Sequence, residues 1–484
     1  MSATQQTGVF QQPVSFHWAA AMPQKVEFRT ISRTRIRPES CVSGSLGLNA
    51  LDHFESWFLL EVVYFYHRAL DPAGLQQSLQ QALQQFPMLC GQLRSASDGT
   101  LRIDYPHAGA LFAACECDLT VEEASKGLHA AYSVYDFIEK INPLLFSAKD
   151  KPLASFKLTR MKDGGSALGI SIAHALTDAY SFYYFIQHWS RIHEGLPAGS
   201  PLHDRSLLYS DIESDIGFPA ATTGLPETCK GFRLLTPRLL LRLISSFIMQ
   251  QNSIVCSVLH FNRQQLLAIK NAALQLGPVS MGDALSAHLW RFFTRLTRAA
   301  ETTAIRRLLI PAGMRPLLNH PQAGHYAGNA IAHLELAYRQ EELDRLDSAA
   351  IAQQCRKQIA AFDRKHIAEQ MVWLRRNEQA KRLYRIYADI DPYAGDCMIS
   401  NLSRLPVYGA RFDGEQPFWA ALPVIPIPGV LQIMPAPDGS GAVDVHAHLP
   451  RSAADTLQGA AWQADLYKYG EADAASGSAQ NQCL

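Results

Sequence analysis

The stretch from Ser166 to Ser190, SALGISIAHALTDAYSFYYFIQHWS, most constrains the fold because its periodicity changes around a single histidine. Residues 167–173 are mostly small or β-branched and apolar, as in a buried strand, whereas aromatic and aliphatic residues recur at helical spacing after Asp178. The pattern therefore predicts a strand, a turn that carries His174, and a helix. Thr177 and Asp178 both have side chains suited to cap that helix.

Length and composition limit the classes of protein to which the chain can belong. Its 484 residues exceed one ordinary core and fit two domains of about 200 residues each. Lys plus Arg and Asp plus Glu both number 44, so no overall charge recruits nucleic acid or an anionic membrane. The nine cysteines include no Cys-x-x-Cys pair, which predicts reduced thiols in a cytoplasmic protein rather than a disulfide framework or a zinc site.

No stretch of the sequence predicts a membrane span. Glu61 interrupts the apolar run WFLLEVVYFY, and two arginines interrupt LLTPRLLLRLISSFIM, for which we expect a packed or crossover helix rather than an amphipathic helix at a membrane surface. The first residues lack a basic region followed by an apolar run, so no signal peptide is expected. The tail from Gly470 is rich in Ala, Ser, Gly and Gln and is expected to be disordered.

Changes in character along the chain predict three parts. Residues 1–200 contain strand-like runs, an amphipathic helix at 73–85, and the histidine segment. Residues 201–252 open with a polar stretch without clear periodicity, which we interpret as the crossover between two domains. Residues 253–484 form the second domain, and the segment near 396–420 is expected to cross back to the first.

The spacing His-x-x-x-Asp occurs twice, so the spacing alone does not identify a site. The copy at His67 ends an apolar run and leads into a loop at Pro72, and we interpret it as a surface turn. The copy at His174 continues into a longer pattern, His-x3-Asp-Ala-x-Ser-x3-Phe-x3-Trp. The added positions of this pattern are Ser181, Phe185 and Trp189.

The longer pattern resembles the signature of the BAHD acyltransferases, which are CoA-dependent enzymes of plants and fungi, and more distantly that of chloramphenicol acetyltransferase. The family usually has Gly after the Asp, where this chain has Ala179, and alanine is tolerated there if the residue is already helical. The resemblance implies an α/β (α+β) fold of two chloramphenicol-acetyltransferase-like domains. Each would be a mixed sheet covered by helices, with the active site at their interface.

Weaker matches to the family extend from about Val26 to Leu457. SMGDALSAHLW resembles the element Ser-x-x-Asp-Ala-Leu-x-Ala-x-x-Trp, and it makes Ser280 and Asp283 candidate contacts to the cofactor. His288 lies in the same element, and a histidine in the middle of a strongly patterned helix favours a structural role.

Arg315 matches a family position that pairs with the motif aspartate. Tyr326, Gly328 and Asn329 match the element that follows it. The resemblance therefore implies an ion pair between Asp178 and Arg315 that joins the two halves, with Asp178 structural rather than catalytic.

A second family signature, Asp-Phe-Gly-Trp-Gly, is degenerate in this chain. Its five positions are occupied by residues 411–415, RFDGE, which keep only the Phe. In the family this loop is thought to be structural, so we expect the change to affect CoA binding more than the type of reaction. Arg411 and Asp413 remain candidate contacts to CoA, and Ser400 occupies the family's hydroxyl position before this loop.

The chemistry of acyl transfer suits these residues. A thioester is already activated, so the enzyme needs a base for the incoming hydroxyl or amine and donors for the tetrahedral oxyanion. We expect His174 to be the base and Ser400 to be an oxyanion donor. The co-substrate would be an acyl-CoA, and no permanently bound cofactor is expected. The acceptor would be a small molecule, and the protein is expected to be a monomer.

Two other functions remain open. One is a binding or scaffold protein that keeps this fold without catalysis, although an intact His174 with Asp178 and Arg315 argues against it. A condensation-type domain that uses carrier-protein thioesters also has a motif histidine, but its doubled His is absent because Ala173 precedes His174. Near the C-terminus, His446 and His448 share one strand face without an apparent third ligand, so no metal site is expected.

Overall fold

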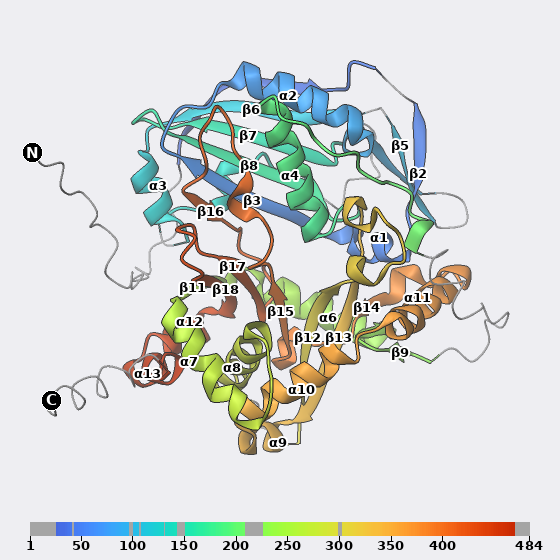
Figure 1. Ribbon diagram of the computed structural model, residues 1–484, viewed down its shortest axis with the longest axis vertical. Coiled ribbons are helices and arrows are strands. Elements are labelled where there is room, and N and C mark those ends of the chain that lie inside the picture. The colour runs from blue at the N-terminus through green and yellow to red at the C-terminus, as the bar shows by residue number, and fades with distance from the viewer. Residues whose placement is uncertain are drawn as a thin grey trace, which may run out of the picture.

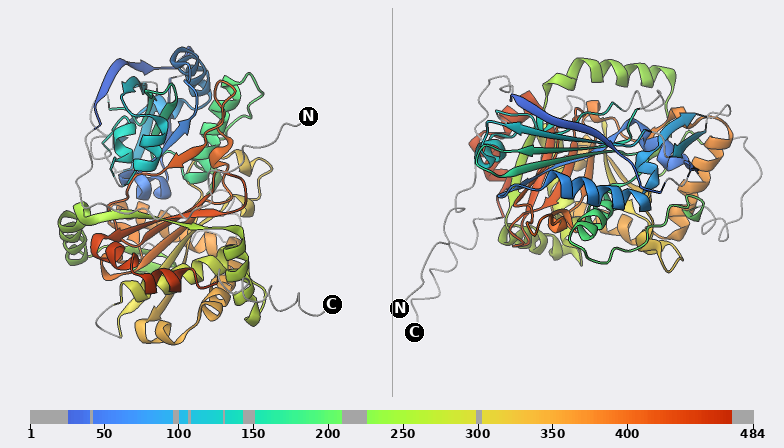
Figure 2. Two further views of the ribbon diagram at one scale, coloured as in Figure 1. Left: turned by 90° about the vertical axis from the view of Figure 1, so that its left-hand side faces the viewer. Right: turned by 90° about the horizontal axis from the view of Figure 1, so that it is seen from above.

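The computed structural model describes residues 26–40, 43–95, 100–105, 108–129, 131–142, 151–208, 226–298 and 303–469. These residues form two halves stacked one above the other, each built on a six-stranded sheet (Figures 1 and 2). The N-terminal leader, the tail from Gly470 and residues 209–225 of the predicted crossover lie outside the described residues.

The first sheet combines strands of the N-terminal half with one strand from far along the chain. Its order is β1-β6-β7-β8-β3-β16, with β6 and β7 parallel and the other neighbours antiparallel. The strands are β1 (Phe28–Ile36), β3 (Leu59–Tyr66), β6 (Ala110–Cys117), β7 (Ala154–Arg160), β8 (Ser166–Ala173) and β16 (Trp419–Ala421). A smaller sheet beside it contains β2 (Gly44–Gly47), β4 (Gln92–Ser95) and β5 (Leu101–Tyr105).

Two helices, α2 (Pro72–Gln85) and α4 (Ala179–His193), pack on the core of the first half. The leucine spacing of α2 buries one stripe of the helix, and the indole Nε1 of Trp189 donates to Ser78 Oγ at 3.0 Å, which ties α4 to α2. Short helices α1 (Ala50–Phe54) and α3 (Val121–Gly127) complete this half.

The second sheet has the order β11-β18-β17-β15-β12-β13 and is also mixed. Its strands are β11 (Ile254–Phe261), β12 (Ile305–Gly313), β13 (Ile331–Arg339), β15 (Cys397–Asn401), β17 (Val430–Pro435) and β18 (Val443–Pro450). A further small sheet contains β9 (Thr228–Cys229), β10 (Phe232–Leu234) and β14 (Ile386–Ala388).

Helices cover one face of the second sheet and share a core with it. The helices of this half are α7 (Arg263–Ala273), α8 (Met281–Leu296), α9 (Gln340–Arg345), α10 (Ser348–Ala360), α11 (Arg364–Gln379), α12 (Arg451–Leu457) and α13 (Ala460–Leu466). Two mixed sheets covered by helices confirm the predicted α/β (α+β) class.

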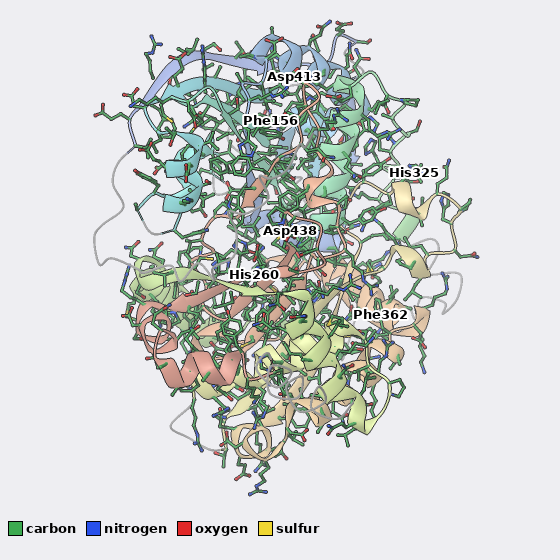
Figure 3. The ribbon with its side chains drawn as sticks, turned by 60° about the vertical axis from the view of Figure 1, so that its left-hand side comes forward. Phe156, His260, His325, Phe362, Asp413 and Asp438 are labelled. Atoms are coloured by element: carbon green, nitrogen blue, oxygen red, sulfur yellow. The ribbon has the colours of Figure 1, made fainter. Side chains whose placement is uncertain are left out.

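Residues from the second half of the chain also lie on the first sheet. β16 pairs with β3, with Trp419 opposite Phe65, and Figure 1 shows β16 in the upper half beside β3. In Figure 3, Asp413 lies near Phe156 in the same half. The halves are therefore linked by chain that returns from the second to the first.

The apolar run at 235–250, expected to be a packed or crossover helix, lies in the predicted crossover and packs little of its surface. It forms α6 (Pro237–Gln250), but only Leu243 of this helix is buried. Arg242 of this helix pairs with Asp391. Its exposed apolar residues are Leu240, Leu241, Ile244, Ile248 and Met249. Within the described residues, no helix is long and apolar enough to cross a membrane.

Candidate active site

His174 follows directly on the last residue of β8. The backbone N–H of His174 donates to Phe58 O at 3.0 Å, which continues the pairing of β8 with β3 by one residue. Its side chain is 15% exposed, and its Nε2 lies 3.6 Å from Oε2 of Glu55. The Nδ1 atom is buried and has no hydrogen-bond partner among the described residues. Nε2 is therefore the ring nitrogen that faces a second titratable group.

Glu55 is a site residue that sequence reasoning missed. It begins the short 3₁₀ segment η1 (Glu55–Trp57) after α1 and is only 7% exposed. Burial raises the pKa of its carboxyl group, the charge of His174 lowers it, and the nearby carboxylates of Asp178 and Asp52 raise it further. The sequence offered no periodicity or motif that marks this position.

Asp178 and Arg315 form the ion pair that the family resemblance implied. Nη1 and Nη2 of Arg315 donate to the two carboxylate oxygens at 2.8 and 3.0 Å. The backbone N–H groups of Ser181 and Ala330 donate to the same carboxylate at 2.8 and 2.9 Å, so Asp178 also caps α4. Burial by itself would raise the pKa of Asp178, but the charge and hydrogen bonds of Arg315 together with the two backbone N–H groups outweigh it, and the pKa is lowered.

Ser181 connects this pair to the second half. Its hydroxyl oxygen accepts from Nη2 of Arg315 at 2.6 Å and from the backbone N–H of Gly328 at 3.0 Å. Ala179 is the first residue of α4, and its φ is not positive, so the departure from the usual Gly costs nothing here. The Ser of the extended pattern therefore has a structural role at the interface.

A second buried pair, Asp52 with Arg205, supports the same turn from another side. Arg205 Nε donates to Asp52 Oδ2 at 2.9 Å, and its Nη2 donates to Leu176 O at 2.9 Å. Asn329 Nδ2 donates to Asp52 Oδ1 at 2.8 Å and to His174 O at 2.9 Å. Carbonyl groups of the turn are thus held by side chains from outside it.

Arg205 was also missed, because it lies in the polar stretch after residue 200 and is 153 residues from its partner. Its guanidinium passes so close to Gly328 that a Cβ there would lie 2.1 Å from Nη1, which accounts for the glycine. The ring of Tyr326 lies between the two arginines, 5.5 Å from the guanidinium carbon of Arg205 and 5.7 Å from that of Arg315.

Ser400 lies on β15 with its side chain half-buried. Its neighbours Cys397 and Ile399 belong to the core under the helices, so Ser400 is on the opposite face of the sheet. In register, Ser400 pairs with Gln432 and Gln432 with His446, which places all three across that face.

Ser280 and Asp283 form a capping box at the start of α8. Asp283 N–H donates to Ser280 Oγ at 3.2 Å, and Ser280 N–H donates to the Asp283 carboxylate at 2.7 Å. A Cβ on Gly282 would lie 3.2 Å from Nδ2 of Asn401, so this helix start adjoins the end of β15. The structure therefore brings Ser280 close to the strand that carries Ser400.

Arg411 and Asp413 lie at the other end of α4. Asp413 accepts from the backbone N–H of Asp71 at 2.7 Å and contacts His193 at 2.8 Å, while Arg411 Nε lies 3.6 Å from Glu194. From Ala179 to His193 at this end, α4 spans roughly 21 Å. The structure does not bring this loop to His174, and both charges already have partners within the protein.

The second His-x-x-x-Asp copy has local structural roles. The ring of His67 stacks on Phe418 with centroids 4.0 Å apart, and Asp71 caps α2 through the N–H groups of Ala73 and Gly74. His288 is buried in α8 and bonds Leu466 O through Nε2 at 2.8 Å. His67 is exposed, as expected for a surface turn, and the buried contact of His288 agrees with a structural role.

Comparison with known proteins places the chain among acyltransferases. It matches the model of the Transferase family over residues 25–461. It is 29% identical to rosmarinate synthase of Plectranthus scutellarioides over 62% of this chain and 68% of that protein. It is also 24% identical to a hydroxycinnamoyltransferase of Narcissus pseudonarcissus, over 85% of this chain and 94% of that protein.

A solved structure shows the same fold. The TRI101 protein of F. graminearum, in complex with coenzyme A and T-2 mycotoxin, superposes with a TM-score of 0.69 at 16% identity, covering 87% of this chain and 98% of that one. The fold is therefore that of two chloramphenicol-acetyltransferase-like domains, as the resemblance implied. With the family model matched over most of its length, the chain belongs to the Transferase family and is a BAHD acyl-CoA-dependent acyltransferase.

Proposed function

We propose that the protein transfers an acyl group from a CoA thioester to a hydroxyl or amine of a small acceptor, with His174 as the general base. The observation that carries the proposal is the placement of His174 at a strand end, on a turn held by Arg315, Arg205 and Asn329. A general base must be held in one orientation relative to the group that it deprotonates.

In the proposed reaction, Nε2 of His174 takes the proton of the acceptor as its oxygen or nitrogen attacks the thioester carbonyl. The resulting oxyanion needs a hydrogen-bond donor, and Ser400 is the proposed one. When the intermediate collapses, the carbon–sulfur bond breaks and CoA leaves as a thiolate. The proton on His174 then passes to that sulfur, so the histidine ends neutral and the product is an ester or an amide.

Asp178 and Arg315 have no chemical step in this proposal. Both oxygens of Asp178 are occupied by Arg315 and by backbone N–H groups, so the carboxylate is not free to orient the imidazole. Their role is to fix the turn. Glu55 is proposed as a positioning residue, because it lies beside the reactive nitrogen of His174.

The proposal also includes domain boundaries near residues 200 and 253 and a monomeric state.

The donors and acceptors to be tested are chosen from the names of the relatives. The name of the Narcissus relative makes a hydroxycinnamoyl-CoA the first donor to try, and acetyl-CoA is the second. An amine acceptor is included because one relative, matched over 91% of its length, is named agmatine coumaroyltransferase-1. Ser280, Asp283, Arg411 and Asp413 stay candidate contacts to CoA, with the first two favoured by their position beside β15.

The test is CoA release by the full-length protein from both donors across alcohol and amine acceptors. We expect His174→Ala to lower kcat by about 10²- to 10⁴-fold, the usual contribution of a general base. The matched control is His67→Ala, which removes the histidine of the other copy and should leave kcat unchanged. Equal rates for wild type and His174→Ala would contradict the proposed base, and no release with any pair would favour a binding protein.

A further inference from the structure

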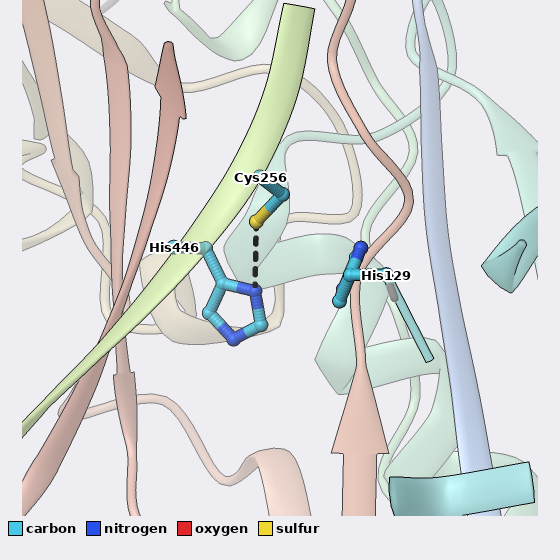
Figure 4. A group of neighbouring side chains, drawn as sticks. All are labelled: His129, Cys256 and His446. Carbon is cyan, nitrogen blue, oxygen red and sulfur yellow. Dashed lines mark hydrogen bonds between the residues drawn. The ribbon is translucent and has the colours of Figure 1, made fainter. Parts of the chain in front are cut away.

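His129, Cys256 and His446 come together at the contact between the two halves, apart from the His174 turn (Figure 4). One ligand atom from each of the three residues lies within 4.8 Å of the others. Cys256 Sγ is 3.8 Å from Nδ1 of His446, and Figure 4 shows His129 to the right, facing both side chains.

Strand pairing explains how two of these side chains meet. β11 and β18 are antiparallel, with Val258 opposite His446 and Cys256 opposite His448. Cys256 and His446 are therefore diagonal neighbours on one face of the sheet. This face is opposite the one packed under the helices, because Val255 and Val445 belong to that core.

His129 comes from the first half, two residues after α3. Its φ of +63° is in the left-handed region, which non-glycine residues seldom adopt, and its backbone N–H donates to Tyr132 O at 3.0 Å. Both ring nitrogens of His129 are buried, and neither has a hydrogen-bond partner among the described residues. A buried polar group without a partner is costly, so a strained turn that carries one calls for a ligand.

We propose that His129, Cys256 and His446 bind one zinc ion that connects the two halves of the protein. Imidazole nitrogen and cysteine sulfur are typical zinc ligands, with bonds of about 2.0 to 2.3 Å, whereas Ca²⁺ and Mg²⁺ prefer oxygen. Such bonds set the ligand atoms roughly 3.5 Å apart in a tetrahedron, close to the observed sulfur–nitrogen distance. Cys256 loses its thiol proton to solvent on binding, and a water molecule takes the fourth position.

His448, the residue that the sequence paired with His446, is not needed as a ligand. Its Nδ1 accepts from the backbone N–H of Ile425 at 3.1 Å, and its Nε2 lies 3.3 Å from Oε1 of Gln432. The third ligand was invisible in the sequence because His129 is 127 residues from Cys256 and belongs to the other half. The absence of a Cys-x-x-Cys pair therefore did not exclude this site.

The experiment measures metal content and stability rather than acyl transfer. Full-length protein is stripped with a chelator, titrated with Zn²⁺, and analysed for bound zinc and for its thermal unfolding temperature. We expect about one zinc per chain and an unfolding temperature that rises with Zn²⁺, because the metal binds only the folded state. With Co²⁺ in place of Zn²⁺, a thiolate charge-transfer band should appear.

The variants Cys256→Ser and His129→Asn should bind zinc at least about tenfold more weakly, since even residues outside the ligand set cost that much when replaced. Cys256→Ser should also lack the cobalt band. Matched controls are Cys115→Ser, a buried thiol outside the cluster, and His260→Asn, on the same face of β11; both should bind like wild type. Less than stoichiometric zinc on the wild type, or equal binding by Cys256→Ser, would overturn the proposal and leave a buried thiol beside two imidazoles.

Discussion

Asp178 and Asp52 are both completely buried, both pair with an arginine, and both support the turn that carries His174. Their environments nevertheless move their pKa values in opposite directions. Asp178 accepts from both terminal nitrogens of Arg315 and from two backbone N–H groups. Asp52 accepts from one guanidinium nitrogen of Arg205, from the side chain of Asn329, and from the backbone N–H groups of Asn49 and Asn329.

The pKa of Asp178 is lowered. The pKa of Asp52 is raised, because burial raises it and Arg205 and Asn329 offset that effect only in part. A buried carboxylate is therefore stabilised by the geometry of its donors rather than by the mere presence of an arginine. Arg315 holds Asp178 through two guanidinium nitrogens, whereas Arg205 reaches Asp52 through one.

The largest expected effect is that of Asp178→Asn. This change leaves the buried guanidinium of Arg315 without its counter-ion, while the amide oxygen can still accept from the backbone N–H of Ser181 at the start of α4. Breaking a buried pair in this way costs about 3 to 5 kcal/mol. The free energy of unfolding, measured by chemical denaturation, should fall by that amount. Asp455→Asn, on an exposed face of α12, is the control and should leave it unchanged.

Asp52→Asn should cost less, about 1 to 3 kcal/mol, because an amide oxygen can still accept from Arg205 and the wild-type carboxylate is itself poorly stabilised. The same denaturation experiment compares the two variants. If Asp52→Asn proved as damaging as Asp178→Asn, the geometry of the arginine contact would not be what distinguishes the pairs.

The Asp178 pair also shows how far sequence reasoning reached. The strand, turn and helix at 166–190 follow from local periodicity, and Arg315 followed from the family pattern, so both appear in the structure as predicted. Arg205 and Glu55 did not, because each meets its partner only through the tertiary fold. The exposure of α6 and the approach of His129 to Cys256 also depend on how distant parts of the chain pack, which leaves no periodic signal in the sequence.

The two pairs should respond to pH in opposite ways. The lowered pKa of Asp178 gives stability that is complete above the unfolded value of about 3.9 and is lost as the pH falls through the folded value. The raised pKa of Asp52 means that its ionised form costs stability at neutral pH, and this cost disappears as the pH falls through its folded value.

Unfolding free energies measured between pH 8 and pH 4 test this contrast. The difference between wild type and Asp52→Asn should grow as the pH falls, because only the wild type gains stability from protonating Asp52. The difference between wild type and Asp178→Asn should stay constant down to about pH 4, and should shrink only below that. Parallel curves for the two variants would show that the carboxylates are in equivalent environments.

The smallest effect is expected at Glu55, which feels both aspartates. Asp178 raises its pKa more than Asp52 does, and its carboxyl lies beside Nε2 of His174. Glu55→Gln keeps a polar contact to the imidazole but cannot ionise. We expect kcat to fall by less than about tenfold, well below the loss for His174→Ala, because a positioning group does not carry the proton.

The acid limb of kcat/KM against pH should lose one ionisation, and Glu55→Asp, which retains a carboxyl group, should restore it. If the limb is the same in wild type and Glu55→Gln, Glu55 is only a buried packing residue, and the two aspartates influence the site solely by holding the turn.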